Sequence, residues 1–417
     1  MKIRPFSALR PADNALAARI ASLPYDVVDT AEARALAGDP LSFYHVVRSE
    51  IDLEEGTPID APEVYAGAAK ALKALESGGS MVREAAPALY LYRQVRLGAA
   101  QTAVVACCSI DDYASGVILK HEKTRKDKED DRTRHILETR AHTGQVFLCY
   151  RDNAGIDGMV ERECGREPMF DFTAEDGVRH VVWRVEGDRA AALAQAFSAV
   201  PRAYIADGHH RSAASFRSGS ELRAAADPST LRPASFADDP GADWFMACLF
   251  PASQLNILPY NRCVRDLNGL SNGDFLKAAL ARGFSAASIA TPENLPAHSC
   301  AMRLSDGWYR LSWPVSAEQA SDPVARLDVA RLQEDLLAPV LGIGDPRTDP
   351  RIYFVGGIRG VSALEGDVDR GKAAVAFAMH PTAIDQMMAV ADAGAMMPPK
   401  STWFEPKLRS GLLVHSF

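Results

Sequence analysis

Hydrophobic and polar positions in the first eighty residues predict three helices. Apolar residues in 14–38 (NALAARIASLPYDVVDTAEARALAG) follow helical spacing, but Pro24 interrupts them. We therefore predict a short helix, an extended piece, and a second helix that is entered through Asp29 or Thr30. Residues 64–79 (VYAGAAKALKALESGG) have helical spacing again and end in glycine, which is typical of a helix stop.

The pattern then changes to strands. Residues 88–97 (ALYLYRQVRL) and 102–110 (TAVVACCSI) are strand-like runs on either side of Gly98, which predicts a hairpin. Residues 178–187 (VRHVVWRVEG) predict another strand, and residues 189–200 (RAAALAQAFSAV) predict a helix.

Further along, a strand over 201–206 is predicted to lead through a turn into a helix that starts within or just after 204–215 (YIADGHHRSAAS). Residues 218–243 are rich in Ser, Pro, Ala and Asp and are expected to form a linker or mobile loop. Residues 325–342 (ARLDVARLQEDLLAPVLG) predict one amphipathic helix. The later strand candidates are 244–250, 301–305, 308–315 and 351–357. The fold class is therefore α+β or mixed α/β.

A chain of 417 residues exceeds what one hydrophobic core usually supports. We expect a first domain with an insertion over 1–240. A C-terminal α/β domain is expected over 241–417, with a last segment that returns to the functional residues of the first domain.

Composition and charge narrow the function classes. Hydrophobic residues at 47% and charged residues at 24% are typical of a globular protein. A net charge of -8 argues against nucleic acid or an anionic membrane as a partner. No apolar run reaches the roughly 18 residues of a membrane span, and Pro5 and Pro11 break the start of the chain, so we expect a cytoplasmic protein. The seven dispersed cysteines are expected to be reduced and mostly buried.

Acid, glycine, histidine and arginine are concentrated at Asp207, Gly208, His209, His210 and Arg211. A strand that enters a helix here places backbone N–H groups at the positive end of the helix, where anions are stabilised. Arginine binds phosphate with its planar fork, and Asp207 could hold Mg²⁺ or accept a proton. The alternative is an ordinary turn with an Asp–Arg pair and one packed histidine. Zinc is disfavoured because adjacent histidines seldom aim at one tetrahedral centre.

The segment 120–140 (KHEKTRKDKEDDRTRHILETR) has eight Lys or Arg and six Asp or Glu, a local excess of positive charge. Most of this segment is typical of the solvated face of a helix with i, i+4 ion pairs. Its beginning differs, because residues 121–124 (HEKT) follow the apolar run 115–119, and His121, Glu122 and Thr124 are expected at the end of a strand. Glu122 is a candidate general base or Mg²⁺ ligand, and Lys123 or Arg132 could contact phosphate.

The segment 396–413 (MMPPKSTWFEPKLRSGLL) is stiffened by three prolines and carries Lys400, Ser401, Thr402 and Lys407. We expect an ordered loop that brings Lys400 to a nucleotide phosphate. The alternative is a rigid strap whose lysines face solvent.

Five ordered segments resemble the bacterial and archaeal domain-of-unknown-function family 1015. They are LPYDVV (23–28), HEKT followed by DR (121–132), ADGHHR (206–211), DPRIYFVGG (349–357) and MPPKSTWFEPKLRSGL (397–412). The DGHHR element is similar to one in free-serine kinases of the ParB and sulfiredoxin-like superfamily, which phosphorylate L-serine with ADP or ATP. This resemblance implies a ParB/sulfiredoxin-like core with a large insertion, in which residues 207–211 bind the transferred phosphate. LPYDVV lies far upstream, so either a large insertion separates it from DGHHR or another segment supplies the early element.

We therefore expect an ATP- or ADP-dependent kinase of a small hydroxyl compound, with L-serine as the first acceptor to test. Glu122, Asp207 and His210 are the candidate catalytic residues, and Glu122 and Asp207 the candidate Mg²⁺ ligands. The candidate phosphate- and nucleotide-binding residues are Gly208, His209, Arg211, Lys123, Arg132, Lys400, Ser401 and Thr402. The alternatives are a ParB-type nucleotide-binding regulatory protein and a phosphatase or other phosphotransferase.

Overall fold

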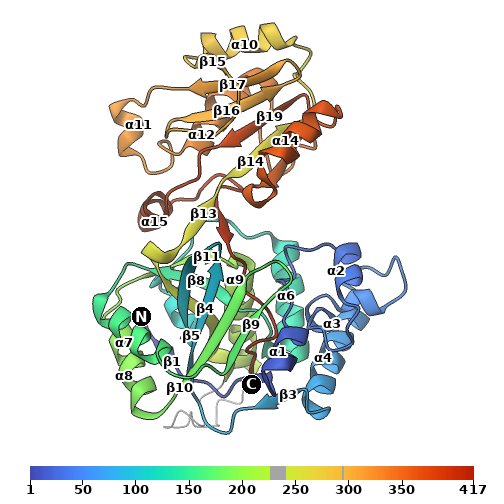
Figure 1. Ribbon diagram of the computed structural model, residues 1–417, viewed down its shortest axis with the longest axis vertical. Coiled ribbons are helices and arrows are strands. Elements are labelled where there is room, and N and C mark those ends of the chain that lie inside the picture. Colours follow the sequence, from blue (N-terminus) through green and yellow to red (C-terminus); the bar gives the residue numbers. More distant parts are fainter. Residues whose placement is uncertain (226–240, 294) are drawn as a thin grey trace. The chain divides into compact units, whose positions relative to one another are not determined.

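The computed structural model describes residues 1–225, 241–293 and 295–417, which form two compact units. The first unit consists of residues 1–119, 123–255 and 406–417. The second unit consists of residues 120–122 and 256–405. Both contain helices and a β-sheet (Figure 1), so the predicted mixed α/β class is confirmed.

A mixed sheet of nine strands forms the centre of the first unit. β8 pairs with β12 and β6 with β11 in parallel, whereas the other pairs are antiparallel. The strand order is β6 (Ile118–Leu119), β11 (Ala203–Asp207), β8 (Val146–Tyr150), β12 (Trp244–Pro251), β5 (Ala99–Ser109), β4 (Leu89–Arg96), β10 (Arg179–Val185) and β9 (Phe170–Thr173), and β1 (Ile3–Arg4) pairs with β5.

The hairpin predicted around Gly98 is β4 and β5, and its strands place Gln94 opposite Gln101. Alternate residues of the sheet face α7 (Ala154–Cys164) and α8 (Gly187–Phe197) in one hydrophobic cluster, as strand periodicity requires. Figure 1 shows these two helices on one side of the sheet. The predicted strand at 178–187 and helix at 189–200 are β10 and α8.

The N-terminal helices build a second hydrophobic cluster. They are α1 (Asn14–Ile20), α2 (Thr30–Leu36), α3 (Tyr44–Val47) and α4 (Pro62–Ser77). Asp13 caps α1, and Asp29 with Glu32 forms a capping box on α2, so the predicted interruption at Pro24 and the entry at Asp29 are confirmed. The C-terminal strand β21 (His415–Ser416) pairs with β7 (Ala141–His142), and the neighbouring Val414 joins this cluster.

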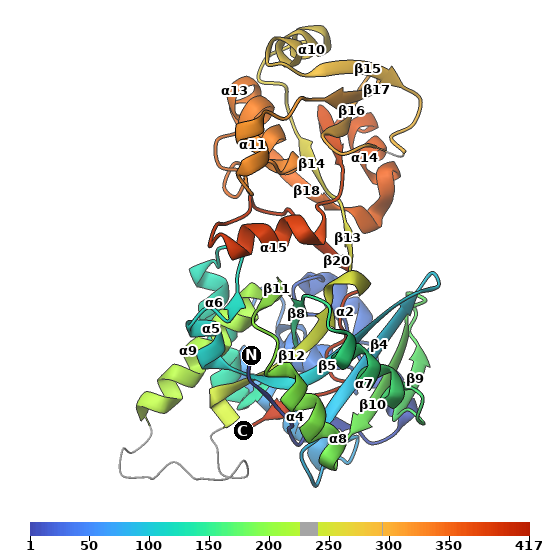
Figure 2. The same ribbon diagram turned by 90° about the vertical axis from the view of Figure 1, so that its left-hand side faces the viewer.

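Helix α9 (His209–Ala225) packs against α6 (Lys126–Thr139), as Figure 2 shows. The helix predicted to start within or just after 204–215 is confirmed, but the linker prediction is wrong for 218–225, which continue α9. The hydroxyls of Ser212, Ser215, Ser218 and Ser220 donate to carbonyls three or four residues earlier, so serine is satisfied within the helix. Of the rest of the predicted linker, residues 226–240 lie outside the described residues, and residues 241–243 form a short turn.

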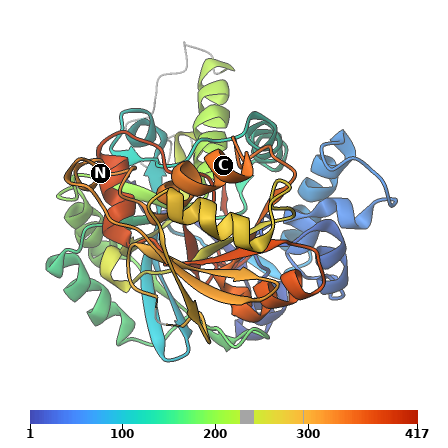
Figure 3. The same ribbon diagram turned by 90° about the horizontal axis from the view of Figure 1, so that it is seen from above.

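The second unit has an antiparallel six-stranded sheet. Helix α14 (Gly360–Asp369) packs on it through Leu364 and Val368, and α10 (Asn272–Ala281) lies over the strands in Figure 3. The strand order is β15 (Ser285–Ile289), β17 (Gly307–Ser312), β16 (Ser299–Leu304), β19 (Val375–Met379), β14 (Tyr260–Val264) and β18 (Ile352–Gly356).

The helix predicted over 325–342 is not one regular helix. It consists of α12 (Asp328–Leu332), a π-helical turn over Gln333–Leu337 and α13 (Ala338–Leu341). Pro339 lacks an N–H group, so a regular i→i−4 ladder could not run through this stretch in any case.

The seven cysteines are free thiols, and six of them are buried, as expected. Among the described residues, no helix combines the length and apolarity that crossing a bilayer demands.

Candidate functional site

The DGHHR segment forms the predicted strand, turn and helix. β11 ends at Asp207 and α9 begins at His209, with Gly208 between them at a φ of +96°. This φ favours glycine, and a Cβ on Gly208 would lie 3.1 Å from the guanidinium carbon of Arg211, tighter than an ordinary contact. The pairing of β11 with β8 shifts register between Ile205 and Asp207, and such a bulge re-aims the side chain that follows.

Arg211 is buried and contacts three segments of the first unit. Its Nη1 donates to the carbonyl of Gln145. Its Nη2 lies 3.5 Å from Asp207 Oδ1 and 3.6 Å from Asp26 Oδ2. Burial alone would lower the pKa of Arg211, but the charges of Asp26 and Asp207 outweigh burial and raise it. Arg211 therefore stays a cation that links the LPYDVV and DGHHR segments.

Lys407 completes the cluster from the C-terminal segment. Its Nζ donates to Asp207 Oδ2 at 3.0 Å. Burial acts to raise the pKa of Asp207, but the charges of Lys407 and Arg211 outweigh it and hold that pKa well below the usual range. Asp207 is therefore an ionised carboxylate at neutral pH.

A pair of buried glutamines anchors the segment 406–417, which we call the C-terminal strap. Gln94 Nε2 donates to the Lys407 carbonyl at 2.8 Å, and Gln101 Nε2 donates to Gln94 Oε1 at 2.9 Å. Both glutamines lie opposite one another in the β4–β5 hairpin. The main chain at Lys407 is thus held to the sheet, and its side chain is directed to Asp207 with little remaining freedom.

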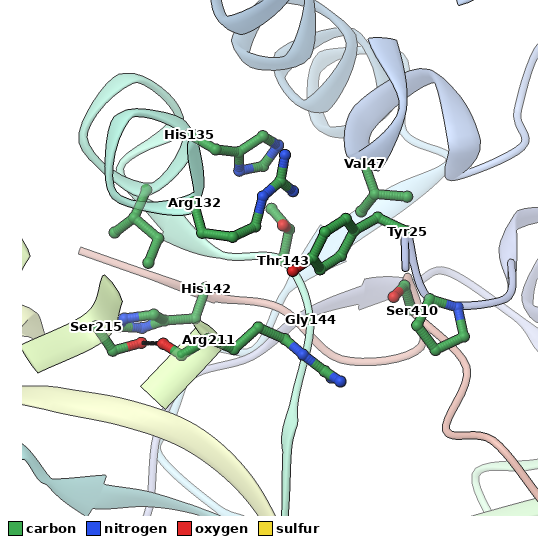
Figure 4. A pocket seen from close by; sticks show the side chains of 12 residues that line it. Tyr25, Val47, Arg132, His135, His142, Thr143, Gly144, Arg211, Ser215 and Ser410 are labelled. Carbon is green, nitrogen blue, oxygen red and sulfur yellow. Dashed lines mark hydrogen bonds between the residues drawn. The ribbon is translucent and has the colours of Figure 1, made fainter. Parts of the chain in front are cut away.

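A small pocket lies beside this cluster, and Figure 4 shows Arg132 of α6 and Arg211 of α9 reaching it from different helices. Its volume is about 30 Å³, which suits water or part of a small ligand. The guanidinium of Arg132 lies 4.1 Å from the centre of the Tyr25 ring and pairs with Asp131 at 2.8 Å. The lining residues are Pro24, Tyr25, Val47, Arg132, His135, Ile136, His142, Thr143, Gly144, Arg211, Ser215 and Ser410.

The histidines of this pocket are neutral at neutral pH. Burial lowers the pKa of His135 to about 4 and that of His142 to about 3. His142 stacks on His415 of the C-terminal strap, and their Nδ1 atoms are 3.1 Å apart. The positive charge at this pocket therefore comes from Arg132 and Arg211.

The structure brings several predicted residues together in the first unit. Asp207 and Arg211 pair directly, and Arg132 lines the same pocket as Arg211. His209 is buried at the start of α9. His210 Nε2 accepts a hydrogen bond from the backbone N–H of Arg125 at 3.0 Å, which ties the loop before α6 to α9. Lys123 belongs to the same unit and is exposed.

The other predicted residues belong to the second unit. They are Glu122, Lys400, Ser401 and Thr402. Lys400 Nζ lies 5.5 Å from the centre of the Tyr260 ring, and Ser401 Oγ donates to the Pro398 carbonyl at 2.6 Å. The lysine that contacts Asp207 is Lys407.

Sequence reasoning did not assign Tyr25, Asp26 or Lys407 to the site. The signal was present, because Tyr25 and Asp26 lie in LPYDVV and Lys407 lies in the C-terminal segment, both of which stood out as motifs. The apparent distance between LPYDVV and DGHHR is a distance along the chain only, since Asp26 and Arg211 pair in space.

The residues around Asp207 suit an anion better than a resident Mg²⁺. Lys407 and Arg211 already pair with the Asp207 carboxylate, and a divalent ion would compete with both. In the part of the chain that the structure describes, no group of three His, Cys, Asp or Glu could hold a metal ion. We therefore assign no Mg²⁺ ligand at Asp207.

This first unit defines a mixed α/β protein with a large mixed sheet and a charged cluster at the junction of β11 and α9. The chain belongs to the DUF1015 family of proteins of unknown function, whose model matches residues 3–330. Comparison with curated proteins finds no match.

Several solved structures are distantly similar. A free serine kinase in complex with AMP has a TM-score of 0.35 and 11% identity, and the match covers 74% of this chain and 92% of that one. A conserved hypothetical protein from Pyrococcus furiosus has a TM-score of 0.34 and 11% identity, over 74% and 95% of the two chains. C-terminally truncated SbnI from Staphylococcus aureus has a TM-score of 0.38 and 11% identity, over 75% and 87%.

Proposed function

We propose that the first unit is a small-molecule kinase that transfers a phosphoryl group from ATP or ADP to a hydroxyl group, with free L-serine as the first acceptor to test. The observation that supports this proposal is the Asp207 carboxylate held between Lys407 and Arg211 at the start of a long helix. The choice of L-serine and of a ParB/sulfiredoxin-like core rests on the resemblance of DGHHR to the free-serine kinases.

The proposed step needs positioning and charge neutralisation more than a strong base. The acceptor oxygen attacks the terminal phosphorus of the nucleotide, and the bond from that phosphorus to the bridging oxygen breaks, which leaves ADP from ATP or AMP from ADP. Asp207 accepts a hydrogen bond from the acceptor hydroxyl and orients it. Because the pKa of Asp207 is low, the proton passes on to water rather than staying on the carboxylate.

Lys407, Arg211 and the N–H groups at the start of α9 stabilise the negative charge of the transferred group. Arg132 supplies a further cation at the pocket beside them. His135 and His142 are neutral there, so they can hydrogen-bond without adding charge.

The test uses the full chain with ATP labelled on its γ-phosphate or ADP labelled on its β-phosphate, Mg²⁺, and either L-serine or a mixture of amino acids and polyols. Labelled phosphoserine, or another labelled small molecule, supports the kinase. Labelled free phosphate would instead establish a phosphatase, and unchanged but bound nucleotide a regulatory protein. Both of these outcomes overturn the proposal.

Asp207→Asn keeps the shape of the side chain and should abolish turnover. Because it also leaves Lys407 and Arg211 without their carboxylate, urea unfolding of the variant is measured to show that it is folded in the assay. The matched control is Asp188→Asn, which changes an exposed acid in the first turn of α8. Turnover that persists in Asp207→Asn would remove this carboxylate from the mechanism.

A further inference from the structure

A second cavity of the first unit is larger than the pocket beside Arg211 and shares no lining residue with it. Its volume is about 320 Å³, at the small end of the range for ligand pockets. It lies where β4, β5 and the end of β8 meet α7. The lining side chains that can form polar contacts are Arg93, Thr102, Tyr150, Asp157, Glu161 and Gln254.

One part of this cavity presents a carboxylate without a cation. Asp157 lies in the first turn of α7, and within the described chain no lysine, arginine or histidine pairs with it. Burial, and then the charge of Asp152, raise its pKa, and no positive group offsets them. Burial also raises the pKa of Tyr150, and the nearby charge of Asp157 raises it further.

The Tyr150 hydroxyl has a free hydrogen-bonding capacity at the same place. Its ring is buried and packs edge-on against Phe197. Its hydroxyl makes no hydrogen bond with the residues that the structure describes, although Tyr150 lines the cavity. A ligand with a cationic donor would satisfy both Asp157 and Tyr150.

Other lining groups present donors. Arg93 Nε donates to Thr102 Oγ1 at 2.8 Å, and one terminal nitrogen lies 3.3 Å from the well-exposed Glu161. Its other terminal nitrogen, Nη1, has no acceptor in the described chain. The guanidinium is fixed over the Trp183 ring, 5.4 Å from its centre.

Gln254 adds a second donor. Its Oε1 accepts from the backbone N–H of Thr102 at 2.7 Å, which orients the amide, and its Nε2 remains available to a ligand. A carboxylate can accept hydrogen bonds from a guanidinium and an amide N–H together.

We propose that this cavity binds a free α-amino acid, with the ammonium group on Asp157 and Tyr150 and the carboxylate on Arg93 and Gln254. The charges of the lining side chains also agree with this ligand. Arg93 is offset by Glu161, and the remaining carboxylate of Asp157 is matched by the ligand's ammonium. The site is separate from the Asp207 cluster and is suited to an effector rather than to the phosphorylated substrate.

The test is the melting temperature of the full chain, followed by calorimetric titration, with each of the twenty amino acids. Their amides, which lack the carboxylate, and their N-acetyl derivatives, which lack the ammonium, are tested beside them. At least one free amino acid should raise the melting temperature, and both of its derivatives should bind at least about tenfold more weakly. Equal binding of the amide would overturn the role of Arg93, and equal binding of the N-acetyl form that of Asp157. No binding by any amino acid would overturn the site.

Variants locate the binding. Asp157→Asn and Arg93→Met should each weaken binding of the amino acid at least about tenfold. Asp188→Asn, in the first turn of the neighbouring α8, should leave this binding unchanged. Tyr150→Phe is a second, milder change that keeps the buried ring. Binding that survives in Asp207→Asn but is lost in Asp157→Asn belongs to this cavity even if the kinase proposal fails. The reverse pattern would show that the amino acid binds at the Asp207 cluster only.

Discussion

Asp207 lies between two cations of different origin, and their roles can be separated. Arg211 follows it by four residues and is fixed by Gln145 and Asp26, whereas Lys407 comes from the C-terminal strap, 200 residues away. Arg211 is therefore a structural link as well as a charge, and Lys407 is the better residue to change when activity is the readout.

Lys407→Met should reduce kcat/KM of the proposed kinase by about a hundredfold, because it removes a positioned cation and keeps the length of the side chain. Lys400→Met is the matched control, since it removes the other lysine of the same segment, which rests over Tyr260 in the second unit. Steady-state kinetics of both variants decide the matter. Equal losses, or a larger loss in Lys400→Met, would contradict the assignment.

The sequence alone does not distinguish Lys400 from Lys407, which lie seven positions apart in one proline-rich segment. Local pattern gives their charge and the stiffness of the chain, but the partner of each depends on where the segment docks. The deciding feature is the pair Gln94 and Gln101, which are visible in the sequence only as polar residues within strand-like runs. Their cross-strand position becomes clear from the hairpin register.

At the level of elements, the C-terminal strap depends on this buried amide pair. Because Gln94 is fully buried, its replacement leaves the Lys407 carbonyl without this donor and leaves the Gln101 amide with only its longer contact, 3.5 Å to the Pro406 carbonyl. Burial of unsatisfied polar groups costs about 1–3 kcal/mol.

Gln94→Leu should therefore lower the free energy of unfolding by about 1–3 kcal/mol and also reduce turnover, since the main chain at Lys407 loses its anchor. Urea unfolding and the kinase assay measure the two effects. Gln195→Leu on α8 is the control, because that exposed amide bonds only to the Ser198 hydroxyl and its loss should change stability by less than about 0.5 kcal/mol. An unchanged Gln94→Leu protein would show that the strap is held by its apolar contacts alone.

Elements with strong periodicity were predictable. The Gly98 hairpin, the capped helices around Pro24 and the helix that starts within DGHHR all follow from local physics. The serine-rich end of α9 was not, because its hydroxyls bond to the helix itself and composition does not reveal that. The π-helical turn at Gln333–Leu337 was also not predicted, because its apolar pattern is close to that of an ordinary helix.

For the whole molecule, buried histidines set the response to acid. Burial is the first cause that lowers the pKa of His135 to about 4 and those of His142 and His180 to about 3, and it also lowers that of His415. The unfolded chain binds protons near pH 6.5, where these folded histidines do not. The stabilisation that comes from keeping these histidines neutral is therefore fully present above about pH 6.5. It is lost progressively as the pH falls toward their pKa values in the folded protein.

Each such histidine contributes a slope of about 1.4 kcal/mol per pH unit within that window. His142→Gln should reduce the slope of unfolding free energy between about pH 4.5 and 5.5 by roughly this amount. His298→Gln is the control, because that side chain is 46% exposed. Urea unfolding across this pH range provides the measurement. A slope that both variants leave unchanged would refute the claim that His142 takes up a proton on unfolding.

The arrangement of the candidate site was the least predictable feature. Asp26 and Lys407 reach Arg211 and Asp207 through pairings between distant parts of the chain, such as Ser22 with Ser410 and Leu9 with Val414. No local pattern encodes such pairings, because their free energy comes from burial of the whole cluster. The motifs could be recognised one by one, but their meeting place could not be inferred from them.

The first unit is assembled from both sides of a long interruption, and this has a consequence for biosynthesis. A ribosome makes residues 256–405 before it makes Lys407. The nascent chain can form helices and the early hairpin, yet its Asp207 must wait for its lysine until the whole second unit has been translated. The proposed phosphoryl transfer would thus be withheld from unfinished polypeptides.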